Sequence, residues 1–139
     1  MDKKIIGYTT GVFDLFHVGH LNILRRAKEQ CDYLIAGVTV DELVSYKKKK
    51  AFIPYEERKE IVGAIRYVDK VVPQKSMDKF AAWEKYHFDK IFVGDDWKGT
   101  PTWNKWEEEF SKVGVEVVYF PYTKQTSSTE LREVLKKLG

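Results

Sequence analysis

Gly11-Val-Phe-Asp-Leu-Phe-His-Val-Gly-His20 is the stretch that decides the fold, because it joins an apolar segment to an amphipathic one. Residues 4–9, before it, are apolar enough for a β-strand in the interior of a sheet. After it, Leu21, Leu24 and Ala27 recur at the spacing of the buried face of a helix. A turn from strand to helix directs backbone N–H groups and the positive end of the helix dipole at one spot. The sequence therefore predicts a phosphate site at this turn.

The rest of the chain repeats this alternation of apolar runs and amphipathic segments. Further strands are predicted over residues 33–40, 70–73, 89–93 and 115–120, and helices over 41–45, 77–87, 101–113 and 128–138. Another helix is predicted to start at Tyr55, with a buried stripe formed by Ile61, Val62, Ile65 and Val68. The alternation predicts a single domain over residues 1–139 with a Rossmann-like, three-layer α/β/α fold around a parallel sheet of about five strands.

Composition narrows the class of protein. The chain has 139 residues, of which 43% are hydrophobic and 14% aromatic, enough for the core of one globular domain. Its 24 Lys and Arg residues are interleaved with 21 Asp and Glu, apart from the run Lys47 to Lys50. This charge distribution suits small anionic substrates and does not require nucleic acid as a partner. The single Cys31 cannot form an internal disulfide, and no apolar run approaches the roughly 20 residues that span a bilayer. We therefore expect a cytoplasmic protein with no membrane partner.

Two histidines mark the predicted site. His17 and His20 are three residues apart, which places both imidazoles on one side of the first helical turn, and Gly19 between them allows close backbone approach. Two donors would then face one anion. From the residues alone, one histidine could instead cap the helix beside a surface histidine. A metal pair is disfavoured by the spacing and by the lack of a third ligand, so no metal ligands are predicted.

The same stretch resembles a known family. It matches the G-x-F-D-x-x-H-x-G-H signature of the nucleotidylyltransferase superfamily at Gly11, Phe13, Asp14, His17, Gly19 and His20. The downstream sequence is similar to the cytidylyltransferase family, above all to its glycerol-3-phosphate cytidylyltransferases. The resemblance implies that CTP and a small phosphorylated alcohol react to a CDP-alcohol and pyrophosphate. It implies catalytic roles for His17 and His20 and nucleotide binding by Thr10, Gly11, Phe13, Asp14 and Gly19.

Basic residues further along the chain match the family as well. Lys47 and Lys49 correspond to lysines around the phosphates, although a run of four lysines is by itself more typical of a solvated face. Arg58 and Arg66 lie in segments that match E-x-R and R-Y-V-D, although each alone is typical of a surface salt bridge. We predict catalytic roles for Lys47 and Arg66 and substrate binding by Lys49 and Arg58. We also predict that both arginines lie on one helix and that Asp69 orients Arg66 in the binding site.

The segment Gly94-Asp-Asp-Trp97 ends a predicted strand, where ligand groups are expected. The resemblance implies that Gly94, Asp96 and Trp97 contact the nucleotide. Asp96 could accept a hydrogen bond from the exocyclic amine of cytosine, which uracil lacks, or could cap a turn. The Trp97 ring could lie against the nucleotide base or could merely pack against the rest of the protein.

The C-terminal signature departs from the family pattern R-T-x-G-I-S-T-T. Here the chain reads Tyr122-Thr-Lys-Gln-Thr-Ser-Ser-Thr129, so Tyr122 replaces the arginine and Gln125 the glycine, and Lys124 could supply the missing charge. Hydroxyls and amides at a helix N-terminus suit the β- and γ-phosphates and can also cap the helix. The predicted ligands here are Thr123, Thr126, Ser127, Ser128 and Thr129.

The resemblance also implies Mg²⁺, bound mainly through the nucleotide phosphates, and a homodimer. Sn-glycerol 3-phosphate is the expected acceptor, and CDP-glycerol would feed cell-wall or capsular polymer synthesis. Phosphocholine, phosphoethanolamine, or adenylyl transfer as in an FAD synthase are alternatives within the same class. A nucleotide-binding regulatory module without turnover is the alternative from a different class. A single-strand nucleic-acid binder is disfavoured, because the aromatic residues do not lie beside the basic run.

Overall fold

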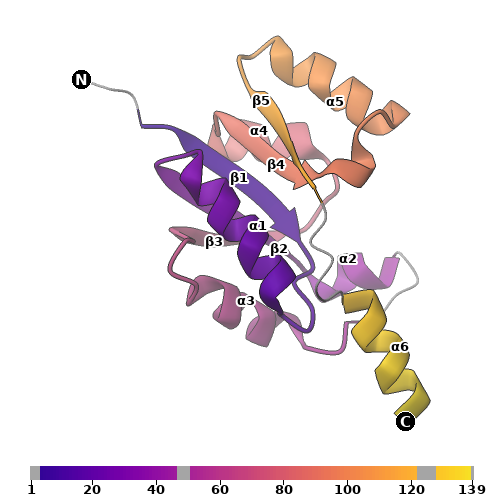
Figure 1. The fold of residues 1–139 in the computed structure, drawn as a ribbon. Coiled ribbons are helices and arrows are strands. Elements are labelled where there is room, and N and C mark those ends of the chain that lie inside the picture. The colour runs from indigo at the N-terminus through magenta and orange to yellow at the C-terminus, as the bar shows by residue number, and fades with distance from the viewer. Residues whose placement is uncertain (1–3, 47–50, 122–127, 139) are drawn as a thin grey trace.

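The structure is a computed structural model that describes residues 4–46, 51–121 and 128–138. Within these residues, five parallel strands form one sheet in the order β3-β2-β1-β4-β5 (Figure 1). The strands are β1 (Ile6–Gly11), β2 (Tyr33–Thr39), β3 (Lys70–Gln74), β4 (Lys90–Gly94) and β5 (Glu116–Phe120). The helices are α1 (Val18–Glu29), α2 (Asp41–Tyr46), α3 (Tyr55–Gly63), α4 (Lys79–Tyr86), the 3-10 turn η1 (Asp95–Trp97), α5 (Pro101–Ser111) and α6 (Ser128–Leu138). The predicted Rossmann-like α/β fold is confirmed.

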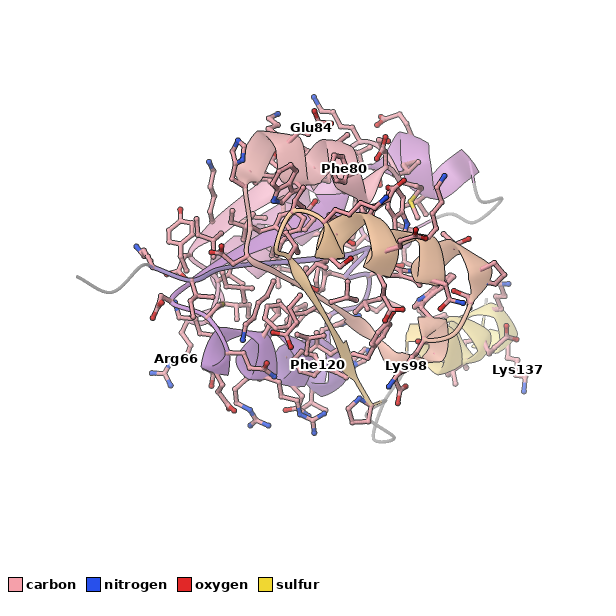
Figure 2. The ribbon with its side chains drawn as sticks, turned by 90° about the horizontal axis from the view of Figure 1, so that it is seen from above. Arg66, Phe80, Glu84, Lys98, Phe120 and Lys137 are labelled. Carbon is pink, nitrogen blue, oxygen red and sulfur yellow. The ribbon has the colours of Figure 1, made fainter. Side chains whose placement is uncertain are left out.

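Helices cover both faces of the sheet. Figure 2 shows α4, marked by Phe80 and Glu84, on one side of the sheet and α1 on the other. Leu24 of α1 and Val62 of α3 are fully buried in the core cluster on one face. Phe110 of α5 is equally buried in the cluster on the opposite face. Each face therefore has its own hydrophobic core, as the alternating sequence predicts.

The order of the strands places the expected ligand-binding position at the carboxyl ends of the neighbouring strands β1 and β4. After β1 the chain adds β2 and β3 on one side, and it later adds β4 and β5 on the other side. The direction of winding thus reverses between β1 and β4, and ligands of open α/β sheets bind at the carboxyl ends of the strands at such a point. Because Thr9 pairs with Phe92, Gly11 and Gly94 lie level at this edge.

Helix α3 differs from the prediction. It ends at Gly63, so Ile65 and Val68 lie beyond it, and Ile61 on the helix is 43% exposed. The buried face of α3 is set by Arg58 and Val62, which lie four residues apart and therefore on one side of the helix. The predicted apolar stripe is wrong for Ile61, because a buried arginine occupies the face that apolar residues alone were expected to mark.

The two helices on the opposite face begin with clear caps. In α4 the Asp78 side chain accepts a hydrogen bond from Ala81 N at 3.1 Å, which makes Lys79 the first helical residue, two positions later than predicted. In α5 the Thr100 hydroxyl accepts from Trp103 N at 3.3 Å, and Pro101 is the first helical residue, as predicted. None of the helices within the described ranges has both the length and the apolar character needed to span a bilayer.

Candidate functional site

A strained turn connects β1 to α1. Phe13 and Leu15 of this motif turn (residues 12–17) have φ angles of +54° and +51°, a left-handed conformation that residues other than glycine rarely adopt. Phe13 is only 6% exposed, and its ring meets the His20 imidazole edge-on, with the centroids 5.6 Å apart. A Cβ atom on Gly11 would lie 3.1 Å from the Phe13 ring, so a larger residue at this position would press against the ring. Phe13 and Gly11 thus shape the turn and support His20.

The two histidines hold each other in place at the start of α1. His17 is the N-cap, and its Nδ1 accepts from Gly19 N at 3.0 Å, while His20 Nδ1 accepts from His17 N at 3.2 Å. This reciprocal capping box keeps the imidazole centroids 4.0 Å apart. Since both Nδ1 atoms accept, each neutral imidazole carries its proton on Nε2. Burial lowers the pKa of His17, which favours that neutral form. Both histidines therefore cap the helix, in place of the predicted single cap beside a surface histidine, and their role as donors to an anion stays a prediction.

Asp14 fixes the motif turn to the segment before α3. Its carboxylate is 1% exposed and accepts from Phe52 N at 2.8 Å and from Ile53 N at 2.9 Å. Hydrogen bonds from backbone amides to a buried carboxylate are charge-assisted and strong. The described contacts give Asp14 a positioning role, and the nucleotide contact predicted for it stays a prediction.

Arg58 is the second residue that links the motif turn to the segment before α3, and its side chain is fully buried. Its Nε donates to Ile53 O at 2.8 Å, and its Nη1 donates to Val12 O at 2.8 Å and to Thr39 O at 2.7 Å. Its Nη2 donates to Asp41 Oδ1 at 2.6 Å, and the side chain has no exposed surface. This corrects the prediction that the Arg58 guanidinium binds phosphate or pyrimidine, because its donors already bind three backbone carbonyls and a carboxylate.

The segment from Arg66 to Asp69 lies at the opposite end of the sheet, where the strands begin. Asp69 precedes β3 and accepts from Leu34 N at 2.8 Å and from Lys28 Nζ at 2.5 Å. Arg66 lies in the turn after α3 and points outward (Figure 2). Both predictions about this pair are wrong, since Arg66 is not on the helix of Arg58 and Asp69 binds Lys28 instead of orienting Arg66. The catalytic role predicted for Arg66 has no support from the position of this turn.

The Asp69 contacts predict a pH-dependent contribution to stability. Burial alone would raise the pKa of Asp69, but the hydrogen bonds from Lys28 and the Leu34 amide outweigh burial and lower the pKa below its ordinary value of 3.8. A lowered pKa stabilises the folded state above pH 3.8, and this contribution is lost as the pH falls through the lowered value. We expect Asp69→Asn to reduce the free energy of unfolding by about 1 kcal/mol at pH 7.

Urea unfolding at several pH values measures this effect. The difference between wild type and Asp69→Asn should shrink as the pH drops below 3.8. Glu29→Gln is the matched control, because Glu29 is 67% exposed and lies 4.0 Å from Arg25. Such a surface ion pair contributes little to stability. An equal loss from both variants, or a difference that does not depend on pH, would contradict the role of the Lys28 ion pair.

The segment after β4 lies beside the motif turn. A Cβ atom on Gly94 would lie 2.8 Å from Asp96 Oδ1, so the Asp96 carboxylate folds back over the end of the strand. Trp97 is 50% exposed, so part of its ring is accessible to a ligand at this edge. The structure therefore brings Gly94, Asp96 and Trp97 to the edge that holds the histidine pair, as predicted.

Lys79 is a site residue that sequence reasoning missed. It is only 7% exposed, and its Nζ donates to the Thr10 hydroxyl at 2.9 Å, at the carboxyl end of β1. Thr10, predicted to bind nucleotide, is thus the contact through which α4 brings a positive charge to this edge. Nothing in the sequence distinguishes Lys79 from the other basic residues, because its burial depends on how α4 packs.

Part of the predicted site lies outside the described residues. Lys47, Lys49, Thr123, Thr126 and Ser127 fall there, as do Tyr122, Lys124 and Gln125. Ser128 and Thr129 are the first two residues of α6. Their predicted roles stay predictions.

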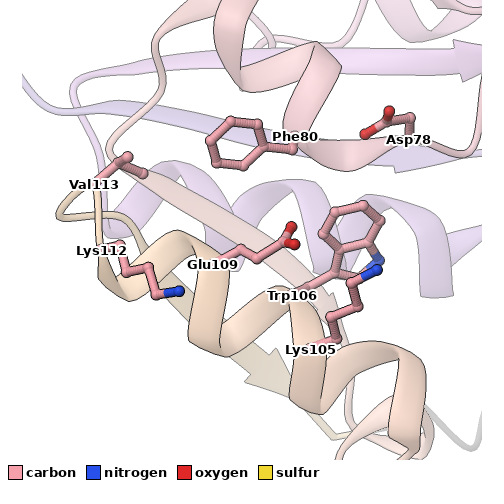
Figure 3. Close-up of a pocket in the computed structure, with 7 residues that line it drawn as sticks. All are labelled: Asp78, Phe80, Lys105, Trp106, Glu109, Lys112 and Val113. Carbon is pink, nitrogen blue, oxygen red and sulfur yellow. The ribbon is translucent and has the colours of Figure 1, made fainter.

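A groove of about 560 Å³ lies between α4 and α5 on the outer face of the molecule (Figure 3). Its walls include Phe80 and Trp106, with Lys105 and Glu109 on α5 and Lys112 just after its end. None of the predicted site residues lines it. The chemistry of the histidine pair is therefore separate from this groove.

Comparisons with known proteins agree with this geometry. The Cytidylyltransferase-like family model matches residues 8–134. The chain is 40% identical to the glycerol-3-phosphate cytidylyltransferase of Bacillus subtilis over 98% of its own length and 99% of the relative. It is 34% identical to the FAD synthase of Thermococcus kodakarensis over 98% of its length and 93% of that relative.

A solved structure shows a similar fold. The lipopolysaccharide core biosynthesis protein from Thermoplasma volcanium superposes with a TM-score of 0.74 at 23% identity. The match covers 89% of this chain and 100% of that protein. At this identity the likeness bears on the fold alone.

Proposed function

Because the chain belongs to the cytidylyltransferase-like family, we propose that it is a nucleotidyltransferase that condenses CTP with sn-glycerol 3-phosphate to CDP-glycerol and pyrophosphate. Relatives named for this activity are more similar to it than the FAD synthases, at 40% against 30% to 37% identity. The proposal extends their reaction to this chain.

The reaction needs positioning and positive charge, and no nucleophilic side chain. An oxygen of the glycerol phosphate attacks the α-phosphorus of CTP, the bond from that phosphorus to the β-phosphate oxygen breaks, and pyrophosphate leaves. Negative charge builds on the oxygens of the transferred phosphorus during this exchange. Donors that already point at those oxygens stabilise the charge without reorganisation.

The reciprocal cap of His17 and His20 is the observation that carries the proposal. Because each Nδ1 accepts a backbone N–H, the donor of each neutral ring is its Nε2–H, and the cap fixes the two rings next to each other at the N-terminus of α1. Backbone N–H groups and the helix dipole attract phosphate to the same place. We assign the α-phosphate of CTP to this position.

The nucleoside and the outer phosphates are assigned by resemblance together with placement. Gly94, Asp96 and Trp97, beside the motif turn, would contact the cytidine. Lys47 and Lys49 with Thr123, Thr126, Ser127, Ser128 and Thr129 would bind the phosphates, as the family resemblance implies. A homodimer and a role in cell-wall or capsular polymer synthesis stay predictions of that resemblance, and a cytoplasmic location stays a prediction from the sequence composition.

Mg²⁺ would enter with the nucleotide. Within residues 4–46, 51–121 and 128–138, no cluster of three His, Cys, Asp or Glu residues could hold a metal ion. The donor set agrees with this, because Nδ1 of both histidines and both oxygens of Asp14 accept backbone hydrogen bonds. The family resemblance implies that phosphate and water oxygens would hold the ion, whose charge offsets that of the polyphosphate.

Lys79 is our candidate for binding the acceptor phosphate. It lies on α4, which packs on the same face of the sheet as α5, and it reaches Thr10 from that face, whereas Gly94 and Asp96 lie at the end of β4, the strand next to β1. The two substrates would then meet over the end of β1. We expect Lys79→Gln to raise the KM for glycerol 3-phosphate about 10- to 100-fold, the loss of one charge-assisted hydrogen bond, with little change in the KM for CTP.

Steady-state kinetics with each substrate varied in turn checks this prediction. Lys85→Gln is the matched control, because this lysine lies in the last turn of the same helix, and its kinetics should equal those of wild type. Equal increases of both KM values in Lys79→Gln would remove Lys79 from the acceptor site.

Pyrophosphate release tests the proposed function as a whole. CTP and ATP are each paired with glycerol 3-phosphate, phosphocholine, phosphoethanolamine and a flavin phosphate, in the presence of Mg²⁺. Release with CTP and glycerol 3-phosphate alone supports the proposal. Release with ATP and the flavin phosphate would make the chain an FAD synthase. CTP binding without release from any pair would favour the regulatory module.

A further inference from the structure

Two buried polar side chains close the neighbouring strands β2 and β3. Thr39 and Gln74 are the last residues of these strands, and they are 3% and 6% exposed. The Thr39 hydroxyl donates to Gln74 Oε1 at 2.6 Å. Buried polar groups of this kind destabilise a protein unless they are hydrogen-bonded, so the two residues depend on each other.

The other end of the Gln74 amide fastens the chain that follows β3. Its Nε2 donates to Ser76 O at 3.3 Å and lies 3.7 Å from Met77 Sδ. The backbone of Gln74 is held as well, because Val40 N donates to its carbonyl oxygen at 3.1 Å. One side chain therefore joins the end of β2 to the turn between β3 and α4.

That turn leads directly to the buried lysine. The Ser76 hydroxyl accepts from Asp78 N at 3.0 Å, and Asp78 caps the first turn of α4. Lys79 is the next residue and reaches Thr10 from there. Because β3 is an edge strand with a single neighbour in the sheet, the Thr39–Gln74 bond supplies support that a second neighbouring strand would give.

We propose that Gln74, held by Thr39, is the positioning residue that sets Lys79 for the acceptor phosphate. The amide touches no substrate and acts only through the turn of residues 75–78. The inference rests on the proposed function in one respect, the acceptor contact of Lys79. It adds that recognition of the acceptor depends on a neutral buried pair on β2 and β3.

Substitutions at both positions test the proposal by kinetics. Gln74→Met removes the polar atoms at similar volume, and Thr39→Val removes the hydroxyl, while Thr39→Ser keeps it. We expect Gln74→Met and Thr39→Val to raise the KM for glycerol 3-phosphate about fivefold with the KM for CTP within about twofold of wild type. Thr39→Ser should behave as wild type. Parallel changes in both KM values would overturn the proposal.

A double-mutant cycle identifies the route of the effect. In a Lys79→Gln background, Gln74→Met should raise the acceptor KM by less than about twofold, because the lysine that it positions is already absent. A further fivefold increase would mean that Gln74 acts on the acceptor independently of Lys79, which contradicts the proposal.

Chemical labelling measures the position of Lys79 without any substrate. Acetic anhydride acetylates accessible amines, and mass spectrometry gives the rate at Lys79 relative to Lys59, whose side chain is 41% exposed. The relative rate should rise about fivefold in Thr39→Val and Gln74→Met and stay unchanged in Thr39→Ser. An unchanged rate in both variants overturns the positioning role. If wild type releases no pyrophosphate, the proposed function fails, and labelling still decides the role of Gln74.

Discussion

Replacing His17 with asparagine is expected to lower kcat about 10²- to 10³-fold while the protein stays folded. Asparagine is a good N-cap, so it can accept from Gly19 N as His17 Nδ1 does at 3.0 Å. It cannot supply the second donor at the distance of Nε2. The variant therefore separates the capping of α1 from the stabilisation of charge at the transferred phosphate.

His20→Gln makes the same separation at the other histidine. Glutamine at the third helical position accepts from the N-cap backbone, as His20 Nδ1 does from His17 N. Initial rates of pyrophosphate release give kcat, and thermal unfolding should place the melting temperature of both variants within about 2 °C of wild type. Full activity in His17→Asn would reduce this residue to a helix cap and would leave our mechanism without its main donor.

Replacing Arg58 with methionine is expected to reduce the free energy of unfolding by at least about 3 kcal/mol. The change keeps an apolar side chain of similar length but removes every donor, so the carbonyl oxygens of Val12, Thr39 and Ile53 lose their partner. An unsatisfied buried carbonyl costs about 1 kcal/mol or more. A ligand-binding arginine would instead change a KM and leave stability unaltered.

Chemical denaturation of Arg58→Met and Lys59→Met checks this expectation. Lys59 is the neighbouring residue on α3 and forms an exposed ion pair with Glu56 at 3.4 Å. Because exposed pairs contribute little, Lys59→Met should reduce the free energy of unfolding by less than about 0.5 kcal/mol. Asp14→Asn provides a milder variant of the same network, because the amide replaces one of two oxygens that accept from backbone N–H groups. Normal stability in Arg58→Met would restore the sequence-based prediction of a ligand-binding role.

The fold was largely predictable because its signals are local. The apolar run over residues 33–40 became β2, Pro101 after Thr100 began α5, and Leu24 and Ala27 are fully buried on α1. The errors occurred where burial depends on distant parts of the chain. Ile61 is exposed because Arg58 takes the inner face of α3, and the partners of Arg58 lie 5 to 46 residues away.

The site divides in the same way. The histidine pair could be predicted, because a spacing of three residues at a helix start fixes the relation of the two side chains. The roles of Lys79 and Gln74 could not be predicted, because each depends on a partner in a distant part of the chain. Thr10 lies 69 positions from Lys79, and Thr39 lies 35 positions from Gln74. No pattern within a segment records such a pairing.

The sequence by itself determined the alternation of strands and helices, the family and the placement of His17 and His20 together at the start of a helix. Only the tertiary structure decided that Asp14 and Arg58 fasten the motif turn, that Asp69 binds Lys28, and that Lys79 is buried beside Thr10. The physical reason is the distance along the chain over which each kind of interaction acts. Periodicity and capping act over a few residues and are written in the local sequence, whereas the pairing of a buried charge depends on which strands the sheet places side by side.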